Sequence, residues 1–209
     1  MGRYPRKLGE GLCYHVRVQC NNKDFRFQTK DDFDRYLFIV DQCRQQLGFF
    51  LNHLVIMHSH VHLIITTPGP ALLNHVMHGI NQKYAFDYNK RHQRHGHLWI
   101  NDYKCSVIDT DRYALSCMRY LDRNPVRAGI VEHPKKWAWS AYNFYSHGDS
   151  KIPIDPHPSY LGLAHNEEVR RGFYRDFVIN LLPSDEAREQ ATIRHMLQPK
   201  RLPKKPKTI

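Results

Sequence analysis

Long apolar runs and nucleotide-binding loops are both missing from this sequence of 209 residues. No apolar stretch approaches the ~18–20 residues that span a bilayer. Residues 1–12 carry three basic side chains with no hydrophobic run behind them, so we expect neither a membrane segment nor a secretory signal. The patterns GxxxxGK[ST] and GxGxxG are also absent, which argues against a nucleotide cofactor.

Cysteine pairs are missing as well. The chain has five cysteines, an odd number, widely spaced and without a CxxC pair. This pattern argues against a disulfide framework and against a cysteine zinc site. We expect free thiols in a reducing cytoplasm.

Acidic residues are few relative to basic ones. The chain has 31 Lys and Arg against 20 Asp and Glu, a formal net charge of +11. Such an excess indicates a polyanionic partner such as nucleic acid, the alternative being a merely basic protein. Hydrophobic residues make up 41% and aromatic residues 12%, which is typical of a globular chain of one domain, or one domain with a small appendage.

Periodicity predicts an α+β fold. The predicted strands cover residues 12–20, 49–57 and 61–67, with a strand or hairpin near 98–107, and the predicted helices cover 30–47, 71–91 and 111–124. Thr29 can cap the first helix and Gly48 can end it, whereas Pro125 biases Asn124 out of the helical region. This order predicts a mainly antiparallel sheet with helices packed on it.

A boundary is expected at residues 147–158, which contain three prolines. We therefore divide the chain into a first domain (1–148), a C-terminal helical extension (159–198) with helices at 166–182 and 184–197, and a tail (199–209) rich in Lys and Pro. The tail cannot bury much apolar surface, so it is either a solubilising segment or an arm that binds phosphates.

Among fifteen histidines, the pair His60 and His62 has an informative spacing. Alternate side chains of a strand share a face, so these two imidazoles would project together while Val61 and Leu63 face the other layer. Two adjacent imidazoles form half of a divalent-metal site, the alternative being two polar residues at the mouth of a strand. His58 shares their parity and is a candidate third member.

The third predicted helix offers another ligand. Tyr120 and Asn124 follow Ser116 at helical spacing, beside an apolar stripe that includes Cys117 and Leu121. The amide oxygen of Asn124 could join two histidines on a hard cation such as Mg²⁺ or Mn²⁺, and the Tyr120 phenol could meet the group that the cation polarises. The alternative is an aromatic residue on a helix flank followed by a helix-ending Asn.

These residues resemble a known family. His60-Val61-His62 after a strand ending in Met resembles the HUH motif of single-strand DNA transposases, although His58-Ser59 stands where Pro-Asn is usual. RYLDRNPVRAG at 119–129 resembles the tyrosine helix of the REP-associated tyrosine transposases. Supporting matches are KYAF at 83–86, GHLW at 96–99 and WSAY at 139–142, in the family's order across about residues 10–145.

The resemblance implies an HUH-endonuclease core, which is ferredoxin-like and RRM-like. It implies that His60, His62 and Asn124 bind Mg²⁺ or Mn²⁺ and that Tyr120 is the nucleophile. The implied reaction is cleavage and rejoining of single-stranded DNA through a 5′-phosphotyrosine at hairpins of repetitive extragenic palindromes, without ATP. It also implies a bacterial cytoplasmic, nucleoid-associated protein, and it leaves monomer and homodimer open.

Basic and aromatic side chains would position the DNA, unless the charges are only solvated and the aromatics only form the core. The candidate DNA-binding residues are Arg119, Arg123, Arg127, Lys83, Lys90, Arg91, Lys200, Arg201, Lys204 and Lys205, and the aromatics that could stack on bases are Tyr84, Trp99, Trp137 and Trp139. Two other functions compete with the enzyme. One is a domesticated protein that binds DNA hairpins without transposition, and the other is an HxH metallohydrolase of small molecules, which the length and charge disfavour.

Overall fold

Four strands form one antiparallel sheet in a computed structural model that describes residues 11–69, 72–100 and 102–197. The strands are β1 (Cys13–Gln19), β2 (Phe50–Ile56), β3 (His60–Thr66) and β4 (Lys104–Ile108), in the order β2-β3-β1-β4. Central β1 pairs with β3 so that Arg17 lies opposite His62 and Gln19 lies opposite His60. This register sets alternate side chains of β1 beside the HxH pair.

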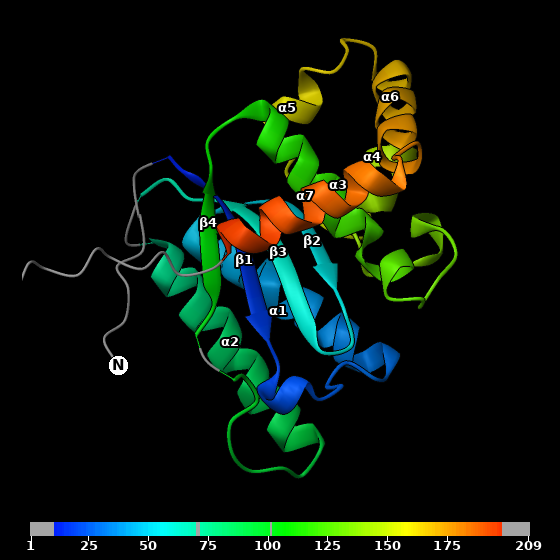
Figure 1. Cartoon of the computed structure of the whole chain (residues 1–209). Coiled ribbons are helices and arrows are strands. Elements are labelled where there is room, and N and C mark those ends of the chain that lie inside the picture. Colours follow the sequence, from blue (N-terminus) through cyan, green and yellow to red (C-terminus); the bar gives the residue numbers. More distant parts are fainter. Residues whose placement is uncertain (1–10, 70–71, 101, 198–209) are drawn as a thin grey trace, which may run out of the picture.

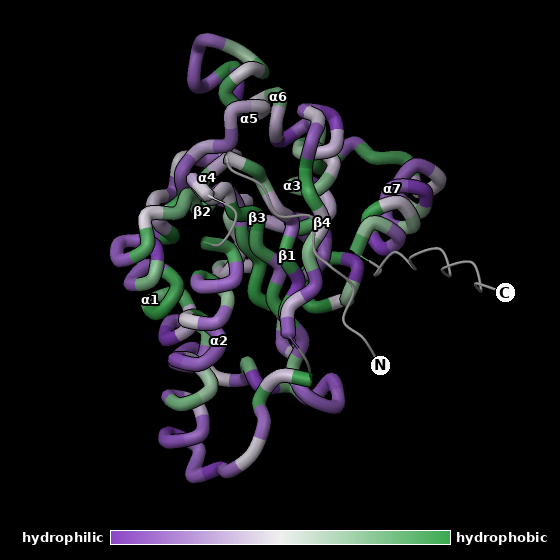
Figure 2. The backbone as a smooth tube through the Cα atoms, turned by 90° about the vertical axis from the view of Figure 1, so that its left-hand side faces the viewer, coloured by the Kyte–Doolittle hydropathy of each residue, from purple (hydrophilic) through white to green (hydrophobic). Residues whose placement is uncertain are grey.

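Two long helices cover one face of the sheet (Figure 2). They are α1 (Lys30–Leu47) and α2 (Leu72–Arg91). Thr29 and Asp32 cap the start of α1 reciprocally, and Gly48 ends it at a positive φ of 66°. Under these helices the side chains of Val16, Val61 and Leu63 are fully buried, as alternation along the strands predicted.

The opposite face carries α3 (Asp111–Arg127), and the C-terminal helices follow it along the chain (Figure 1). These helices are α4 (Tyr142–His147), α5 (Pro158–Leu161), α6 (Glu167–Ile179) and α7 (Pro183–Met196), and two 3-10 turns are η1 (Asn21–Lys23) and η2 (Pro134–Lys136). In Figures 1 and 2, α7 runs across the face of the sheet opposite α1 and α2. No helix within the described ranges is long and apolar enough to cross a membrane.

The predicted α+β fold with an antiparallel sheet is confirmed, and α1 has the predicted bounds. The prediction that Pro125 ends the third helix at Asn124 is wrong, because α3 continues through this proline to Arg127. A proline there removes only one backbone donor, close to the end of the helix. The Ala128 N–H donates to the Asn124 carbonyl at 3.0 Å and closes the last turn.

A buried carboxylate fixes α3 against its neighbours. Asp122 is fully buried and accepts hydrogen bonds from the Ser140 hydroxyl at 2.9 Å and the Tyr174 hydroxyl at 2.6 Å. The Nε2 of His53, on β2, lies 3.1 Å from the same carboxylate. Since Tyr174 belongs to α6, this cluster joins the predicted first domain to the predicted extension. The division at 148–159 stays a prediction.

Candidate active site

Side chains of β3 and α3 meet on the face of the sheet opposite α1 and α2. The rings of His60 and His62 have centroids 5.2 Å apart, and the ring of Tyr120 lies 5.8 Å from that of His62. His62 and Tyr120 are both buried, with 1% and 6% of their surfaces exposed. The structure therefore brings together the histidine pair and the tyrosine that the sequence singled out, from segments far apart in the chain.

Each imidazole of the pair has a polar neighbour at Nδ1. The Nδ1 of His62 lies 2.8 Å from the Nε2 of His15, and the Nδ1 of His60 lies 3.2 Å from the Ser59 hydroxyl. With both Nδ1 atoms engaged, Nε2 is the nitrogen that each ring can offer to a ligand.

Burial keeps this pair neutral. Burial, aided by the charge of Arg17, lowers the pKa of His60 to about 3. Burial has the largest effect on His62 and electrostatic repulsion from His15 the next largest, and both hold the pKa of His62 well below 6.5. Neutral imidazole is the form that binds a metal ion, so both rings are ready to act as ligands at neutral pH.

Asn124 is the third predicted ligand. Its side-chain nitrogen, as oriented, is buried and has no hydrogen-bond partner among the described residues. The two ends of an amide are interchangeable in such an assignment, and exchanging them turns the unpaired atom into an oxygen ligand. The described part of the chain contains no group of three or more His, Cys, Asp or Glu arranged for a metal ion, and the ligand role of Asn124 stays a prediction. Two imidazoles and one amide oxygen fit Mn²⁺ or Mg²⁺.

Two cations border Tyr120. The guanidinium of Arg127 lies 4.4 Å from the centroid of the Tyr120 ring and donates to the Tyr120 carbonyl at 2.6 Å. Arg17 interacts electrostatically with the same phenol. Burial lowers the pKa of both arginines, but a guanidinium remains charged in proteins. Positive charge at this position stabilises a phenolate and attracts a phosphate.

This donor set lies within a region that matches a family model. The model described as "Transposase IS200 like" matches residues 10–124, which include both histidines, Tyr120 and Asn124. The chain belongs to the IS200-like transposase family. This membership places it among transposases that bind and recombine DNA.

One solved structure agrees with the fold of this IS200-like transposase. The structure described as the "REP associates tyrosine transposase bound to a REP hairpin" is 19% identical, with a TM-score of 0.59, over 75% of this chain and 93% of that one. A candidate transposase from Deinococcus radiodurans R1 is 22% identical, with a TM-score of 0.40, over 55% of this chain and 91% of that one. No curated protein matches the sequence.

The three arginines predicted to hold DNA phosphates are bound to carboxylates of α7 in this transposase. Arg123 makes two contacts with Glu186, at 2.7 and 3.0 Å, and Arg127 contacts the same carboxylate at 3.3 Å. Arg119 pairs with Glu189 and packs on the Phe177 ring at 3.9 Å. Their role with DNA stays a prediction, and it requires phosphates to replace these glutamates.

The second helix offers fewer free cations than the sequence implied. Arg91 is bound by the carboxylates of Asp31, Asp32 and Asp87, at 2.7–2.9 Å. Lys83 donates to the Gln46 side chain at 2.9 Å, and Lys90 is exposed. The remaining candidates, Lys200, Arg201, Lys204 and Lys205, lie outside the described residues.

His58 is not part of the histidine cluster, contrary to the parity argument. β3 begins at His60, so strand alternation does not extend back to residue 58. The Nδ1 of His58 lies 2.6 Å from the Phe27 carbonyl, and its ring packs against Phe33 and Trp137. Trp137, like Tyr84, is buried in the core and unavailable for stacking on a base.

Sequence reasoning missed His15 and Arg17. Both alternate along β1 on the face of His62, and the strand register brings them beside it. A signal existed in the sequence, since the polar residues His15, Arg17 and Gln19 alternate with apolar ones along this strand. It became interpretable only once β1 was known to pair with β3.

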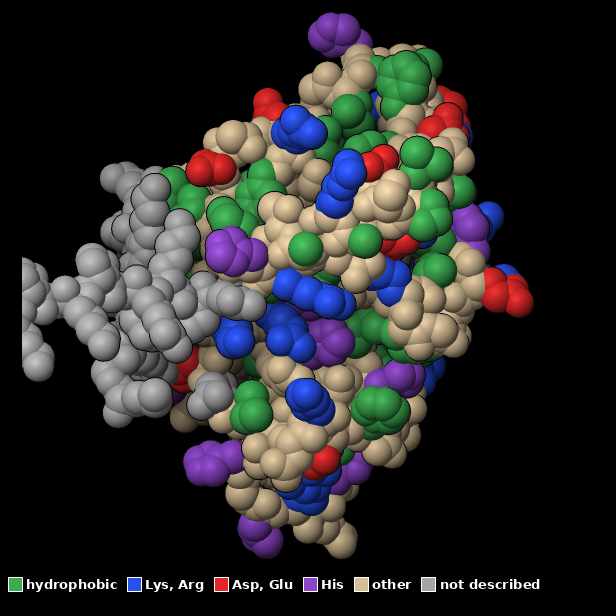
Figure 3. Space-filling model, in the orientation of Figure 1, with side chains coloured by type: hydrophobic (Ala, Val, Ile, Leu, Met, Phe, Trp, Pro, Cys, Tyr) green, Lys and Arg blue, Asp and Glu red, His purple; other side chains and the backbone are tan. Residues whose placement is uncertain are grey.

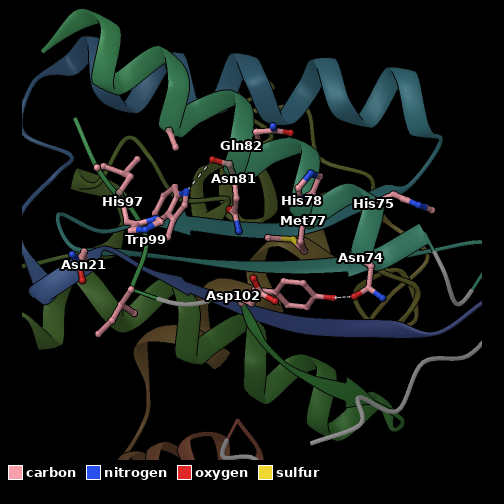
Figure 4. A pocket seen from close by; sticks show the side chains of 15 residues that line it. Asn21, Asn74, His75, Met77, His78, Asn81, Gln82, His97, Trp99 and Asp102 are labelled. Carbon is pink, nitrogen blue, oxygen red and sulfur yellow. Dashed lines mark hydrogen bonds between the residues drawn. The ribbon is translucent and has the colours of Figure 1, made fainter. Parts of the chain in front are cut away.

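A cavity of this transposase lies away from Tyr120 and the histidine pair. It has a volume of about 920 Å³ and opens between α2 and the segment before β4 (Figure 4). Asn81, Gln82, His97 and Trp99 line it, and the Trp99 indole donates to the Asn81 carbonyl at 3.0 Å.

On the face shown in Figure 3, Lys and Arg side chains gather near the middle, beside a histidine. That arrangement suits a polyanion.

Proposed function

We propose that this IS200-like transposase cleaves and rejoins single-stranded DNA beside hairpins, with Tyr120 as the nucleophile. The observation that carries the proposal is the contact between the Tyr120 ring and His62, at 5.8 Å, in a buried site with two guanidinium groups. His60, His62 and Asn124 would hold Mg²⁺ or Mn²⁺. When bound, the cation would withdraw charge from a phosphate oxygen and make the phosphorus more electrophilic.

Tyr120 performs the first transesterification. Its phenolic oxygen forms a bond to phosphorus, and the bond from phosphorus to the 3′ oxygen breaks. The phenolic proton passes to water, and the departing 3′ oxygen takes up a proton to become a hydroxyl. The product is a 5′-phosphotyrosine that conserves the energy of the phosphodiester. A 3′-hydroxyl then attacks this ester and releases Tyr120, so rejoining needs no nucleotide.

The arginines beside Tyr120 serve both steps. Tyrosine has an ordinary pKa of ~10, so it must lose its proton as it attacks. The positive charges of Arg17 and Arg127 stabilise the phenolate, and they also stabilise the additional negative charge of the reacting phosphate. Arg127 is held in place before substrate arrives, because it donates hydrogen bonds to the Tyr120 carbonyl and to Glu186.

A hairpin substrate is supported by the fold shared with a transposase whose structure contains a REP hairpin. The net charge of +11 agrees with a nucleic-acid partner. Tyr120 meets His62 of the same chain, which supports a site complete within one chain, in a monomer or in each half of a homodimer. The second candidate function is hairpin binding without transposition.

The decisive experiment looks for a covalent adduct. The protein is incubated with a labelled hairpin oligonucleotide that has single-stranded flanks, with Mg²⁺ or Mn²⁺, and resolved on a denaturing gel. We expect an adduct with the native protein and with Tyr88→Phe, a control for loss of a buried phenol on α2, and none with Tyr120→Phe or a chelator. Tight binding without an adduct in either metal would establish the hairpin-binding function instead.

A further inference from the structure

A chain of buried polar side chains runs from β4 to His62. His15 is fully buried, and its Nε2 lies 2.8 Å from the His62 Nδ1, with the two rings stacked at 5.0 Å. The other nitrogen of His15, Nδ1, lies 3.9 Å from the Cys117 sulfur. Beyond it, Tyr113 interacts with Cys117 and its hydroxyl lies 3.2 Å from that of Ser106.

The contact between the two imidazoles holds one proton, and its position decides whether His62 can bind a metal. If the His62 Nδ1–H donates to His15, the His62 Nε2 keeps a lone pair. If instead the His15 Nε2–H donates, neutral His62 carries its own proton on Nε2 and has no lone pair to offer. The two tautomers therefore correspond to a ligand and a non-ligand.

The surroundings favour the first arrangement. The charges that act on His62 include the guanidinium groups of Arg17 and Arg127, which are hydrogen-bond donors only. An N–H on the His62 Nε2 would point the positive end of a dipole into a site that already holds two guanidinium charges, whereas a lone pair complements these charges. At the far side of His15, its Nδ1–H then faces the sulfur of Cys117, which can accept it.

We propose that His15 is a positioning residue that holds His62 in the Nδ1–H tautomer and so directs its Nε2 lone pair into the site. This inference rests on the proposed function, in which His62 is a ligand. A histidine ligand that donates its second N–H to a protein acceptor is oriented and made more basic, and loss of such an acceptor typically lowers metal affinity by about 10–100-fold. Here the acceptor is a second imidazole from the neighbouring strand.

The first test needs no variant of His15 and no metal. In the metal-free protein labelled with ¹⁵N-histidine, long-range ¹H–¹⁵N correlation spectra distinguish the two tautomers of each ring. The His62 signals are identified by their loss in His62→Gln. We expect His62 in the Nδ1–H form, and an Nε2–H form would overturn the proposal.

The second test measures Mn²⁺ affinity by calorimetry. We expect His15→Phe, which has no acceptor, to bind Mn²⁺ about 10–100-fold more weakly. His15→Gln, whose amide oxygen can accept the same proton, should recover part of the loss. The matched control is His58→Gln, which removes an imidazole that packs against Phe33 and Trp137 outside the histidine cluster and should leave Mn²⁺ affinity unchanged.

The two proposals fail in different ways. Native affinity in His15→Phe, measured where circular dichroism shows it folded, would refute the role of His15 while the metal site stands. Absence of Mn²⁺ binding by the native protein, or unchanged binding by His62→Gln, would instead refute the metal site. An unchanged hairpin affinity in His15→Phe is expected, because His15 is buried beneath the site and contacts no solvent.

Discussion

The carboxylates of α7 bind the arginines of α3 that are predicted to hold DNA, and we predict that removing their charge strengthens DNA binding. Glu186 and Glu189 bind Arg119, Arg123 and Arg127, whose side chains are only 14–17% exposed. Changing both glutamates to Gln keeps a carbonyl acceptor for each guanidinium but cancels the negative charge. Three arginines then stand without a counter-charge beside Tyr120.

The magnitude follows from the number of phosphates that these cations can hold. The double variant removes two negative charges, which lets the three arginines hold two more phosphates, and each phosphate contact contributes roughly 0.7 to the slope of log affinity against log salt for single-stranded DNA. The slope should therefore steepen by about 1.4, which corresponds to roughly sevenfold more loss of affinity between about 50 and 200 mM salt. Because Gln still accepts hydrogen bonds, the free energy of unfolding should fall by only about 1–2 kcal/mol.

Fluorescence anisotropy with a labelled hairpin oligonucleotide across a salt series measures this slope. The control is Glu167→Gln with Glu168→Gln on α6, which removes the same two charges from pairs with Arg171 and Arg175. We expect tighter binding at low salt and a steeper slope for the α7 variant alone. Equal slopes for the two double variants would refute the reasoning, because they would show that total charge rather than these arginines governs binding.

Three further outcomes are expected. Asp122→Ala should lower the free energy of unfolding by about 3–5 kcal/mol in urea denaturation, because two buried hydroxyl donors lose their acceptor; a loss below about 1 kcal/mol would contradict this. The metal-free protein should lose stability as the pH falls from about 6.5 toward 3, because His15 and His60, with pKa values of about 3, stay neutral when folded but take up protons when unfolded. His15→Phe should reduce this dependence, and an unchanged pH profile of urea midpoints would exclude the histidine as its source. Deleting residues 199–209 should flatten the salt dependence of DNA affinity, and an unchanged slope would show that the tail makes no phosphate contacts.

Local pattern predicted the parts of the site that lie on single elements. Strand alternation placed His60 and His62 on one face, and helical spacing placed Tyr120 beside the buried stripe that includes Cys117. The short helices α4 and α5 were not predicted, because runs of six and four residues carry too little periodicity. The predicted end of the third helix at Asn124 was wrong because a proline near the end of a helix, such as Pro125, does not stop the helix.

Contacts between distant segments could not be predicted from the sequence. The pairing of Glu186 with Arg123 and Arg127 spans about 60 residues and leaves no periodic trace. His15 gained meaning only from the register of β1 on β3. Alternation determines which face a residue occupies, but the neighbours across a sheet or between helices follow from tertiary packing.

The buried carboxylate of Asp122 also limits how this protein can be recombined with its relatives. Asp122 lies two residues from Tyr120 on the same helix, yet one of its donors, Tyr174, comes from beyond the predicted boundary at 148–159. In a chimaera that joins the first 148 residues to a C-terminal part lacking this hydroxyl, the buried Asp122 carboxylate would lose one of its hydrogen-bond donors. The C-terminal part of such a chimaera would also have to supply carboxylates at the positions of Glu186 and Glu189, which pair with the arginines of α3. Substitutions in either part are therefore constrained by the side chains that they contact in the other part.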